Sequence, residues 1–389
     1  MITREITPEL IQVASEYPVV TLTGPRQSGK TTLAKLTFPA YKYCSMEDPA
    51  LKAYASSDPR AFLKEYDSHV IIDEVQRVPL LLSYIQTLVD ADPNSTKGRF
   101  ILTGSHQLEL RAEVSQSLAG RTALLTLLPL SISEVETIEK EMDRDDFLFK
   151  GFFPRVYQDK INPSRAYANY YRTYVERDVR QLINLKDASL FEKFIKLMAG
   201  RVGQILNLNS LANDVGVSST TLKKWLSILE VSFILYKLSP FYENFGKRVI
   251  KSPKYYFTDV GLLCFLLGIQ DKKQISRDPL IGNIFENLVV IESLKSQYNQ
   301  GKTDALYFFR DNNGNEVDIV FQDGRKLIPI EIKSSSTFST HFIKGIEKFQ
   351  KTAKEAKKGC IIYSGDFTPE TDTYKVLNFK DTKSVFVPA

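Results

Sequence analysis

Residues 18–38, PVVTLTGPRQSGKTTLAKLTF, decide the fold of the N-terminal part of this chain. An apolar, β-branched run is followed by a loop with a glycine at each end, and then by a segment of helix-forming residues. Gly24, Gly29, Lys30 and Thr31 have the spacing G-x-x-x-x-G-K-[ST]. The glycines let the loop curl so that its N–H groups point at a phosphate, and the helix N-terminus adds positive potential. The stretch therefore predicts a strand, a phosphate-binding loop and a helix.

The loop also predicts how a nucleotide is held. Lys30 is expected to reach the β- and γ-phosphates, and the Thr31 hydroxyl is expected to hold Mg²⁺. The residues predicted to bind the nucleotide in this loop are Gly24, Pro25, Arg26, Gln27, Ser28, Gly29, Lys30, Thr31 and Thr32.

A second motif follows in HVIIDEVQRVPLLLSYIQTLVD, residues 69–90, which predicts a buried strand ending in Asp73 and Glu74 and then a helix. After a phosphate-binding loop, Asp73 is expected to hold Mg²⁺ through water, and Glu74 is expected to act as the catalytic residue that polarises the attacking water. Without such a loop, the acidic pair would indicate helix N-capping. The two motifs together predict ATP and Mg²⁺ as cofactors.

Arg121 follows a short helical stretch in SQSLAGRTALLTLLPLSISEVE. A positive charge near the γ-phosphate bound by a neighbouring subunit would stabilise the transition state of hydrolysis. A surface arginine without a catalytic role is the alternative. Both interpretations stay open.

The middle of the chain is basic and predicts a winged helix. Residues 160–273 hold 18 Lys and Arg against 9 Asp and Glu, in a chain of net charge +5. Residues 161–188 predict lid helices, and residues 189–274 have helix-turn-helix patterning, with Gly216 at the turn and strands at 232–240 and 253–259 as the wing. The apolar face of the second helix is predicted to hold Leu222, Trp225, Leu226 and Leu229. The basic residues that would contact DNA are Lys223, Lys224, Lys247, Arg248, Lys251 and Lys254. DNA contact and packing against another domain both remain possible roles.

The last part, residues 275–389, predicts a helix, three strands, a helix and a strand. This order resembles the PD-(D/E)XK nuclease core. The matching residues are an acid on the first helix (Glu286), an aspartate on the second strand (Asp318) and Glu331-x-Lys333 on the third. Asp318 and Glu331 on adjacent strands can share one Mg²⁺, and Lys333 is expected to be catalytic by positioning hydroxide or the scissile phosphate. Glu286 would complete the metal site. A salt-bridge cluster is the alternative.

The ordered motifs TGPRQSGKTTLAK, IIDEVQRVP, ILTGSHQ, LAGR, LPLSISE, GFFPRV and YVERDVRQL resemble a bacterial and archaeal group of AAA-superfamily ATPases with a C-terminal domain of unknown function. The resemblance implies an α/β fold, with a P-loop AAA+ core of parallel strands over residues 1–160. It implies that Ser105 or Gln107 is a γ-phosphate sensor, and that Pro154 and Arg155 contact the nucleotide. Phe152 departs from the commoner Gly-Gly opening of that last motif.

Composition excludes some classes of protein. No apolar run approaches the length of a membrane span, residues 1–10 do not have the pattern of a secretion signal, and the cysteines (Cys44, Cys264 and Cys360) are far apart. A cytoplasmic protein without a membrane partner is expected. The leading hypothesis is an ATP-hydrolysing protein that acts on nucleic acid, with metal-dependent nuclease activity left open. The alternative is a regulatory switch or a protein-remodelling ATPase with a non-catalytic docking tail, and a homo-oligomer or a protein partner is compatible with either.

Overall fold

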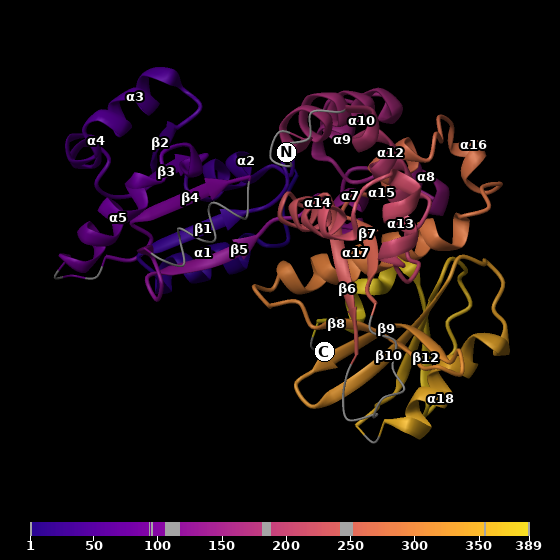
Figure 1. Ribbon diagram of the computed structural model, residues 1–389. Helices are drawn as coiled ribbons and strands as arrows, with labels where there is room; N and C mark the ends of the chain where they lie inside the picture. The colour runs from indigo at the N-terminus through magenta and orange to yellow at the C-terminus, as the bar shows by residue number, and fades with distance from the viewer. Residues whose placement is uncertain are drawn as a thin grey trace. The chain divides into compact units, whose positions relative to one another are not determined.

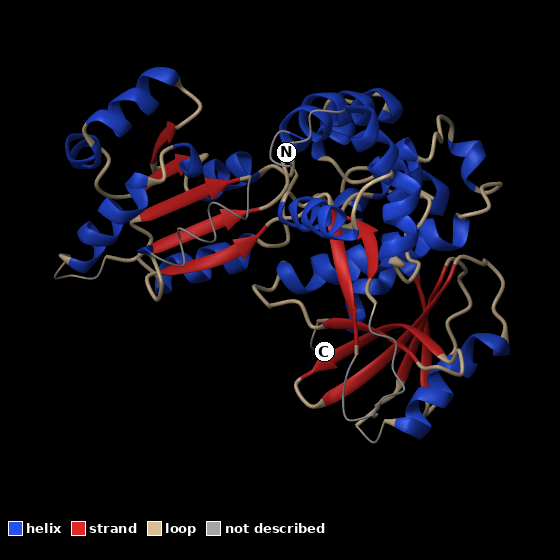
Figure 2. Cartoon of the chain, viewed as in Figure 1, coloured by secondary structure: helices blue, strands red, loops and turns tan. Residues whose placement is uncertain are grey.

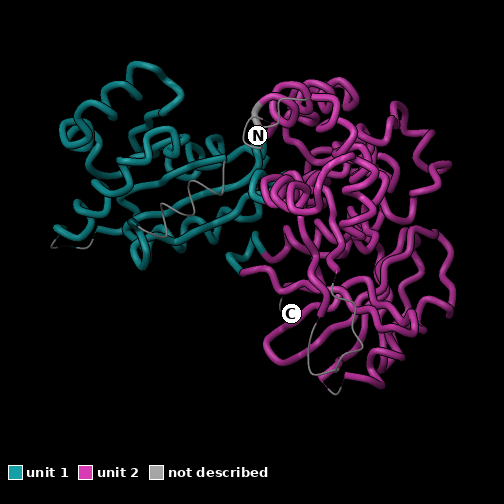
Figure 3. Tube along the Cα trace, in the orientation of Figure 1, with its two compact units in different colours: residues 1–130, 231–233, 298–302 teal, residues 131–230, 234–297, 303–389 magenta. Residues whose placement is uncertain are grey.

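The computed structural model describes residues 2–92, 94, 96–105, 117–180, 188–241, 252–353 and 355–387. The chain forms two compact units (Figure 3). The first unit comprises residues 1–130 with residues 231–233 and 298–302. The second comprises residues 131–230, 234–297 and 303–389. Each unit has its own β-sheet.

The sheet of the first unit is parallel and has the strand order β2-β3-β4-β1-β5 (Figure 1). Its strands are β1 (Val19–Thr23), β2 (Lys42–Ser45), β3 (Val70–Asp73), β4 (Phe100–Gly104) and β5 (Thr122–Thr126). All neighbouring pairs run parallel. The three central strands β3, β4 and β1 are buried along their whole length, which is typical of a parallel sheet covered on both faces.

Helices cover both faces of this sheet because successive strand residues point to opposite sides. Val20 and Leu22 pack in a core with residues of α1 (Thr7–Glu16) and α2 (Lys30–Thr37). Val19 packs in a second core with residues of α4 (Pro59–Glu65) and α5 (Leu80–Asp90), against which α3 (Pro49–Ser57) also packs. A short 3₁₀ turn, Val75–Arg77, directly follows β3. The predicted α/β core of parallel strands is confirmed.

The second unit begins with helices, drawn in magenta tones in Figure 1. In chain order they are α7 (Ile132–Glu136), α8 (Arg144–Lys150), α9 (Pro154–Gln158), α10 (Pro163–Tyr170), a π-helical segment Tyr171–Val179, α12 (Ala188–Ala199), α13 (Leu208–Val215) and α14 (Ser219–Val231). Later helices are α15 (Val260–Leu266), α16 (Lys272–Ile275), α17 (Ile281–Tyr298) and α18 (Lys344–Thr352), with 3₁₀ turns at Thr340–Ile343 and Phe379–Val385.

One mixed sheet runs through the second unit in the order β12-β11-β10-β9-β8-β6-β7. Its strands are β6 (Leu235–Pro240), β7 (Lys254–Phe257), β8 (Leu306–Arg310), β9 (Glu316–Asp323), β10 (Lys326–Lys333), β11 (Gly359–Tyr363) and β12 (Tyr374–Asn378). Figure 2 shows β6 reaching from the helical part toward the C-terminal strands. Its end pairs in parallel with β8, through Ser239 with Tyr307 and Pro240 with Phe308.

The two helices predicted on either side of Gly216 are present. The C-terminal part has the predicted order of helix, three strands, helix and strand, followed by one strand that was not predicted, β12. Gly216 ends α13 with a φ of 94°, a left-handed conformation that glycine adopts readily. The apolar face of α14 is buried at its four predicted positions. The strands predicted as a wing, β6 and β7, pair antiparallel but also extend the C-terminal sheet. The boundaries at 160, 188 and 274 stay predictions, and the structure adds that this sheet continues across the last of them.

The three cysteines are buried and free. Within the described ranges, no helix has both the length and the apolar character needed to cross a membrane.

Candidate functional site

The phosphate-binding loop of the first unit connects β1 to α2 and depends on two glycines. Gly24 has a φ of 149°, and a Cβ added there would lie 2.1 Å from the Leu127 carbonyl oxygen. Gly29 precedes α2 with a φ of 91°. Because only glycine tolerates such a close approach and readily adopts such a φ, these two positions allow the loop to curl. A pocket of about 340 Å³ lies over the loop, lined by Arg26, Gln27, Gly29, Lys30, Thr31, Thr32, Glu47 and Glu74.

Lys30 is buried at the start of α2. Its Nζ donates to the carbonyl oxygens of Gly24 (2.9 Å) and Pro25 (2.8 Å), so the loop itself satisfies the ammonium group. Burial lowers the pKa of Lys30 to about 8, against the opposing effect of the Glu74 and Asp73 charges. A negatively charged phosphate is therefore the partner that would best stabilise this cation.

The residues predicted to hold Mg²⁺ are in contact. The Thr31 hydroxyl donates to Asp73 Oδ1 at 2.9 Å, and Asp73 is the last residue of β3. Thr103 and Tyr43 also donate to the Asp73 carboxylate, the latter to Oδ2 at 3.0 Å. A hydroxyl and a carboxylate beside a phosphate pocket are the hard oxygen donors that suit Mg²⁺, so Thr31 and Asp73 fit the ion.

Glu74 lies directly after β3 and has a left-handed backbone, with φ 52° and ψ 46°. Its Oε2 accepts a hydrogen bond from the Ser105 hydroxyl at 3.0 Å. Ser105 follows β4 and is buried, so the structure brings the predicted sensor next to the predicted catalytic acid. Gln107 lies outside the described residues.

Arg121 makes a two-contact salt bridge on the surface of the first unit. Its Nε and Nη2 lie 2.5 and 2.8 Å from the two carboxylate oxygens of Asp90. This pairing agrees with the interpretation of Arg121 as a surface arginine. Its role in hydrolysis by a neighbouring subunit stays a prediction. Pro154 is the first residue of α9 in the second unit, and its predicted contact with the nucleotide also stays a prediction.

The sequence analysis did not identify Arg4, which hydrogen-bonds to the phosphate-binding loop. It is buried, and its guanidinium donates to the Ser28 carbonyl oxygen (2.7 Å) and to the Leu128 carbonyl oxygen (2.8 Å). No local motif marks this residue, because its partners lie 24 and 124 positions away in the chain.

In the second unit, the hairpin of β9 and β10 brings three predicted site residues together. Its register pairs Ile319 with Ile330, which places Asp318 opposite Glu331 on one face of the sheet. The Lys333 ammonium lies 2.6 Å from Glu331 Oε1 and 3.7 Å from Asp318 Oδ2. The backbone N–H of Ile332 donates to Asp318 Oδ2 at 2.7 Å. The predicted convergence of these side chains is therefore present.

A buried lysine joins Glu286 to this cluster. Lys254 Nζ, on β7, lies 3.1 Å from Glu286 Oε1 and 2.7 Å from Glu316 Oε1, and its side chain is 3% exposed. The Tyr256 hydroxyl also donates to Glu286 Oε1, at 2.5 Å. Although burial acts against it, the three carboxylates of Glu286, Asp318 and Glu316 raise the pKa of Lys254. We call Lys254, Glu286, Glu316, Asp318, Glu331 and Lys333 the acid–lysine cluster.

The position of Lys254 corrects its predicted role as a DNA-contacting residue of the wing. Its side chain is buried between carboxylates because β7 belongs to the same sheet as β9 and β10, and a DNA phosphate cannot reach it there. The predicted contacts Lys247, Arg248 and Lys251 lie outside the described residues.

The lysines of the acid–lysine cluster neutralise much of the negative charge of its carboxylates. Among the described residues, no group of three or more His, Cys, Asp or Glu side chains has an arrangement that could hold a metal ion. Glu331 Oε2 and Arg310 Nε are nevertheless buried without a hydrogen-bond partner among the described residues. The metal-binding roles of Glu286, Asp318 and Glu331 stay predictions.

The buried carboxyl of Glu331 predicts a pH-dependent stability. Burial and the Asp318 charge raise the pKa of Glu331 from 4.5 to about 8. Between these two values the folded state keeps a proton that the unfolded state releases, so the free energy of unfolding should fall as the pH rises from 4.5 to about 8. Glu331→Gln should flatten this decline, measured by urea unfolding in EDTA-containing buffers. The control is Glu370→Gln at an exposed glutamate, which should leave the pH dependence of the free energy of unfolding unchanged. The same pH dependence in Glu331→Gln as in the parent would contradict a raised pKa of Glu331.

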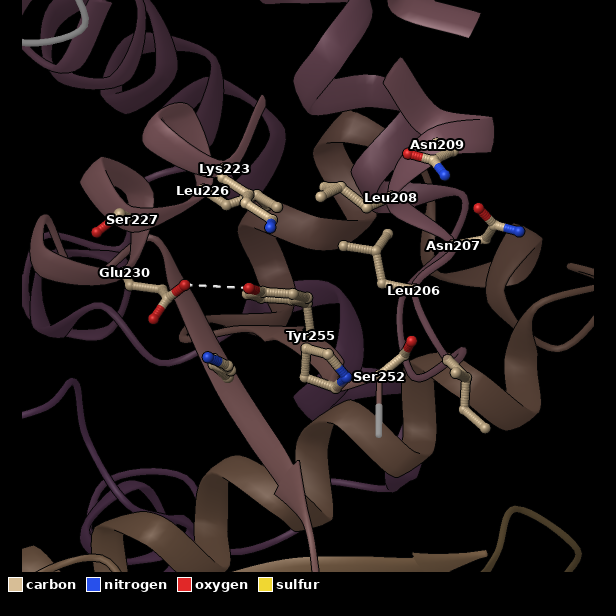
Figure 4. A pocket seen from close by; sticks show the side chains of 13 residues that line it. Leu206, Asn207, Leu208, Asn209, Lys223, Leu226, Ser227, Glu230, Ser252 and Tyr255 are labelled. Carbon is tan, nitrogen blue, oxygen red and sulfur yellow. Dashed lines mark hydrogen bonds between the residues drawn. The ribbon is translucent and has the colours of Figure 1, made fainter. Parts of the chain in front are cut away.

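A second pocket, of about 820 Å³, lies beside the helix-turn-helix (Figure 4). Lys223, Leu226, Ser227 and Glu230 of α14 line it together with residues 205–209 and with Lys237, Ser252, Pro253 and Tyr255. The Tyr255 hydroxyl donates to Glu230 Oε1 at 3.1 Å. Burial raises the pKa of Glu230. The predicted DNA contact Lys223 therefore lines a concave surface that also holds a carboxylate.

Comparison with known families defines the class of protein. Residues 16–136 match the family described as an AAA domain. Residues 141–273 and 281–381 match two families that are both described as domains of unknown function, DUF8612 and DUF4143. The chain is thus an AAA-type P-loop protein whose C-terminal region carries domains of unknown function.

The chain also matches whole proteins. It is 32% identical over 337 residues to uncharacterized proteins of Mycobacterium tuberculosis and Mycobacterium bovis, covering 86% of this chain and 74% of each relative. It belongs to the family of these mycobacterial proteins. An uncharacterized protein of Haemophilus influenzae is 25% identical, over 88% of this chain and 89% of its own length. A Walker-type ATPase of Pyrococcus abyssi is 15% identical with a TM-score of 0.40, over 68% of this chain and 96% of its own. A structural similarity this low does not establish a shared fold.

Proposed function

We propose that the first unit binds and hydrolyses ATP with Mg²⁺. One observation carries this proposal: four predicted residues converge at the phosphate-binding loop. Thr31 contacts Asp73, Lys30 contacts the loop carbonyls, and Glu74 lines the same pocket as Lys30 and Thr31. The AAA domain match over residues 16–136 supports it. The bound Mg²⁺ would neutralise charge on the phosphates, and the protein's own groups would orient the nucleotide and accept a proton from water.

The test of this proposal is phosphate release from ATP, measured with Mg²⁺ and again with EDTA in its place. Turnover with Mg²⁺ and none with EDTA is the expected result. Nucleotide binding without turnover in either condition would contradict hydrolysis and leave only a nucleotide-binding role.

We further propose that the chain acts on nucleic acid through its second unit. Support comes from the basic middle of the chain, from the helix-turn-helix elements with the exposed Lys223 and Lys224, and from the acid–lysine cluster with the order of a PD-(D/E)XK core. In that core, Glu286, Asp318 and Glu331 would hold a divalent ion for phosphodiester cleavage, and Lys333 would stabilise the scissile phosphate.

If α14 contacts phosphates, nucleic-acid affinity must depend on salt. Each lost phosphate contact lowers the slope of log K against log salt by about 1, so Lys223→Ala with Lys224→Ala should lower it by about 2. The slope would be measured by fluorescence anisotropy of a labelled duplex. Lys357→Ala with Lys358→Ala is the matched control, because it removes another adjacent lysine pair and should leave the slope unchanged. Equal slopes for parent and α14 variant would assign α14 to packing.

A specific observation favours the alternative of a nucleotide-dependent switch with a docking tail. Lys254 and Lys333 already neutralise much of the charge of the acid–lysine cluster, as a structural cluster would require. Under this alternative, Mg²⁺ and Mn²⁺ leave the stability of the chain's second unit unchanged. Under the nuclease hypothesis they raise it, and Asp318→Ala removes the effect.

A further inference from the structure

Gln76 is a buried glutamine that directly contacts the proposed catalytic acid. It lies in the 3₁₀ turn Val75–Arg77 that follows β3, and its side chain is 8% exposed. Its Nε2 donates to Glu74 Oε2 at 2.5 Å and lies 3.4 Å from the Ser105 hydroxyl oxygen. Both donors to Glu74 therefore bind the same carboxylate oxygen, Oε2.

The other end of the Gln76 amide is unsatisfied. Within the described part of the chain, Gln76 Oε1 is buried and has no hydrogen-bond partner. The amide cannot be turned around to relieve this, because Oε1 would then face the carboxylate of Glu74 and two acceptors would meet. A buried amide oxygen without a partner costs free energy, so the position indicates a group that supplies a donor during function.

The backbone of Glu74 fixes the direction of the carboxylate that Gln76 contacts. Glu74 has a φ of 52°, which is strained for a side chain other than glycine, and its N–H donates to the Thr103 hydroxyl at 3.3 Å. Such strain is stored where the surrounding structure requires one side-chain direction. The Glu74 side chain lines the pocket above the phosphate-binding loop, and the Gln76 amide is hydrogen-bonded to its carboxylate.

We propose that Gln76 positions the water that attacks ATP; this rests on the proposed hydrolysis. The water donates one O–H to the Glu74 carboxylate and the other to Gln76 Oε1, which leaves a lone pair for the γ-phosphorus. As the new P–O bond forms, Glu74 takes the first proton, the bond from the γ-phosphorus to the bridging oxygen breaks, and ADP leaves with that electron pair. Gln76 Nε2 holds the carboxylate in place. Orientation of the attacking water by a glutamine is an established device in phosphoryl transfer.

The test is Gln76→Met, which keeps the length of the side chain and removes both polar atoms. The kcat for ATP should fall by about 100-fold, because the water loses its orientation, while the affinity for a fluorescent ATP analogue stays unchanged. Gln12→Met is the matched control, since Gln12 also donates to a glutamate, Glu16, but on the exposed face of α1.

The affinity for the ATP analogue separates a role at the water from a structural one, because a structural defect of the loop would weaken nucleotide binding as well as turnover. Parent-like kcat in Gln76→Met, with a parent that hydrolyses ATP, would overturn the inference alone. A parent that hydrolyses no ATP would instead overturn the proposed function. Loss of nucleotide affinity in Gln76→Met would assign the residue to folding of the loop and would also overturn the inference.

Discussion

Lys30→Ala is expected to abolish tight nucleotide binding, and Glu74→Gln is expected to keep ATP bound and stop turnover. Lys30 is the buried cation of the phosphate-binding loop, and Asp73 and Glu74 lie close enough for their charges to affect its ionisation. Removing it leaves acidic groups facing the phosphates, so affinity should fall by roughly 10- to 100-fold or more. Equilibrium binding of a fluorescent ATP analogue measures this loss.

Glu74→Gln acts on a different step. The amide keeps the size of the side chain but cannot take a proton, so phosphate release should fall by at least about 100-fold at unchanged affinity. Glu16→Gln is the control, because Glu16 ends α1 on the surface and should keep the parent rate. Hydrolysis at the parent rate by Glu74→Gln would show that another group activates the water.

The second large effect is expected on stability. Lys254→Met removes the ammonium that lies between Glu286 and Glu316. Glu286 then loses its cation in the interior of the second unit, whereas Glu316 keeps its ion pair with Arg310. Breaking a buried ion pair from one side costs about 3–5 kcal/mol, which urea unfolding followed by circular dichroism would detect. Lys358→Met, at an exposed pair with Glu370, should cost less than about 1 kcal/mol.

The response of the Lys254→Met variant to divalent ions is informative about the tail. Mg²⁺ or Mn²⁺ that restores its stability would show that the remaining carboxylates accept a cation, as the nuclease hypothesis requires. A loss below about 1 kcal/mol in metal-free buffer would contradict the view that Lys254 is the cation that compensates this cluster.

The sequence predicted best those features that depend on local spacing. The phosphate-binding loop is one continuous stretch in which each glycine and Lys30 have a fixed task, so its geometry follows from residue order. The pairing of Asp318 with Glu331 follows from the period of two in strands and from a short turn at Gly324, where φ is 62°. Both could be derived without knowledge of the fold.

The features that the sequence did not predict depend on contacts between residues far apart in the chain. Lys254 lies in a basic stretch that predicts a DNA-contacting wing. The pairing of β6 with β8 instead places it against Glu316 of β9 and Glu286 of α17. Arg4 reaches the phosphate-binding loop only because α1 packs on the same sheet face as α2. Gln76 is close to Glu74 in sequence, yet its importance depends on burial and on the unsatisfied Oε1, and residue type shows neither.

The ATPase rate with and without double-stranded DNA, single-stranded DNA and RNA tests the central claim most directly. Glu74→Gln supplies the blank, and the Lys223→Ala with Lys224→Ala variant tests whether α14 mediates the effect. The account predicts Mg²⁺-dependent hydrolysis that at least one nucleic acid accelerates in the parent and accelerates less in the α14 variant. A rate that equals the Glu74→Gln blank under all conditions would contradict ATP hydrolysis. A genuine rate that no nucleic acid changes would contradict action on nucleic acid and favour the switch.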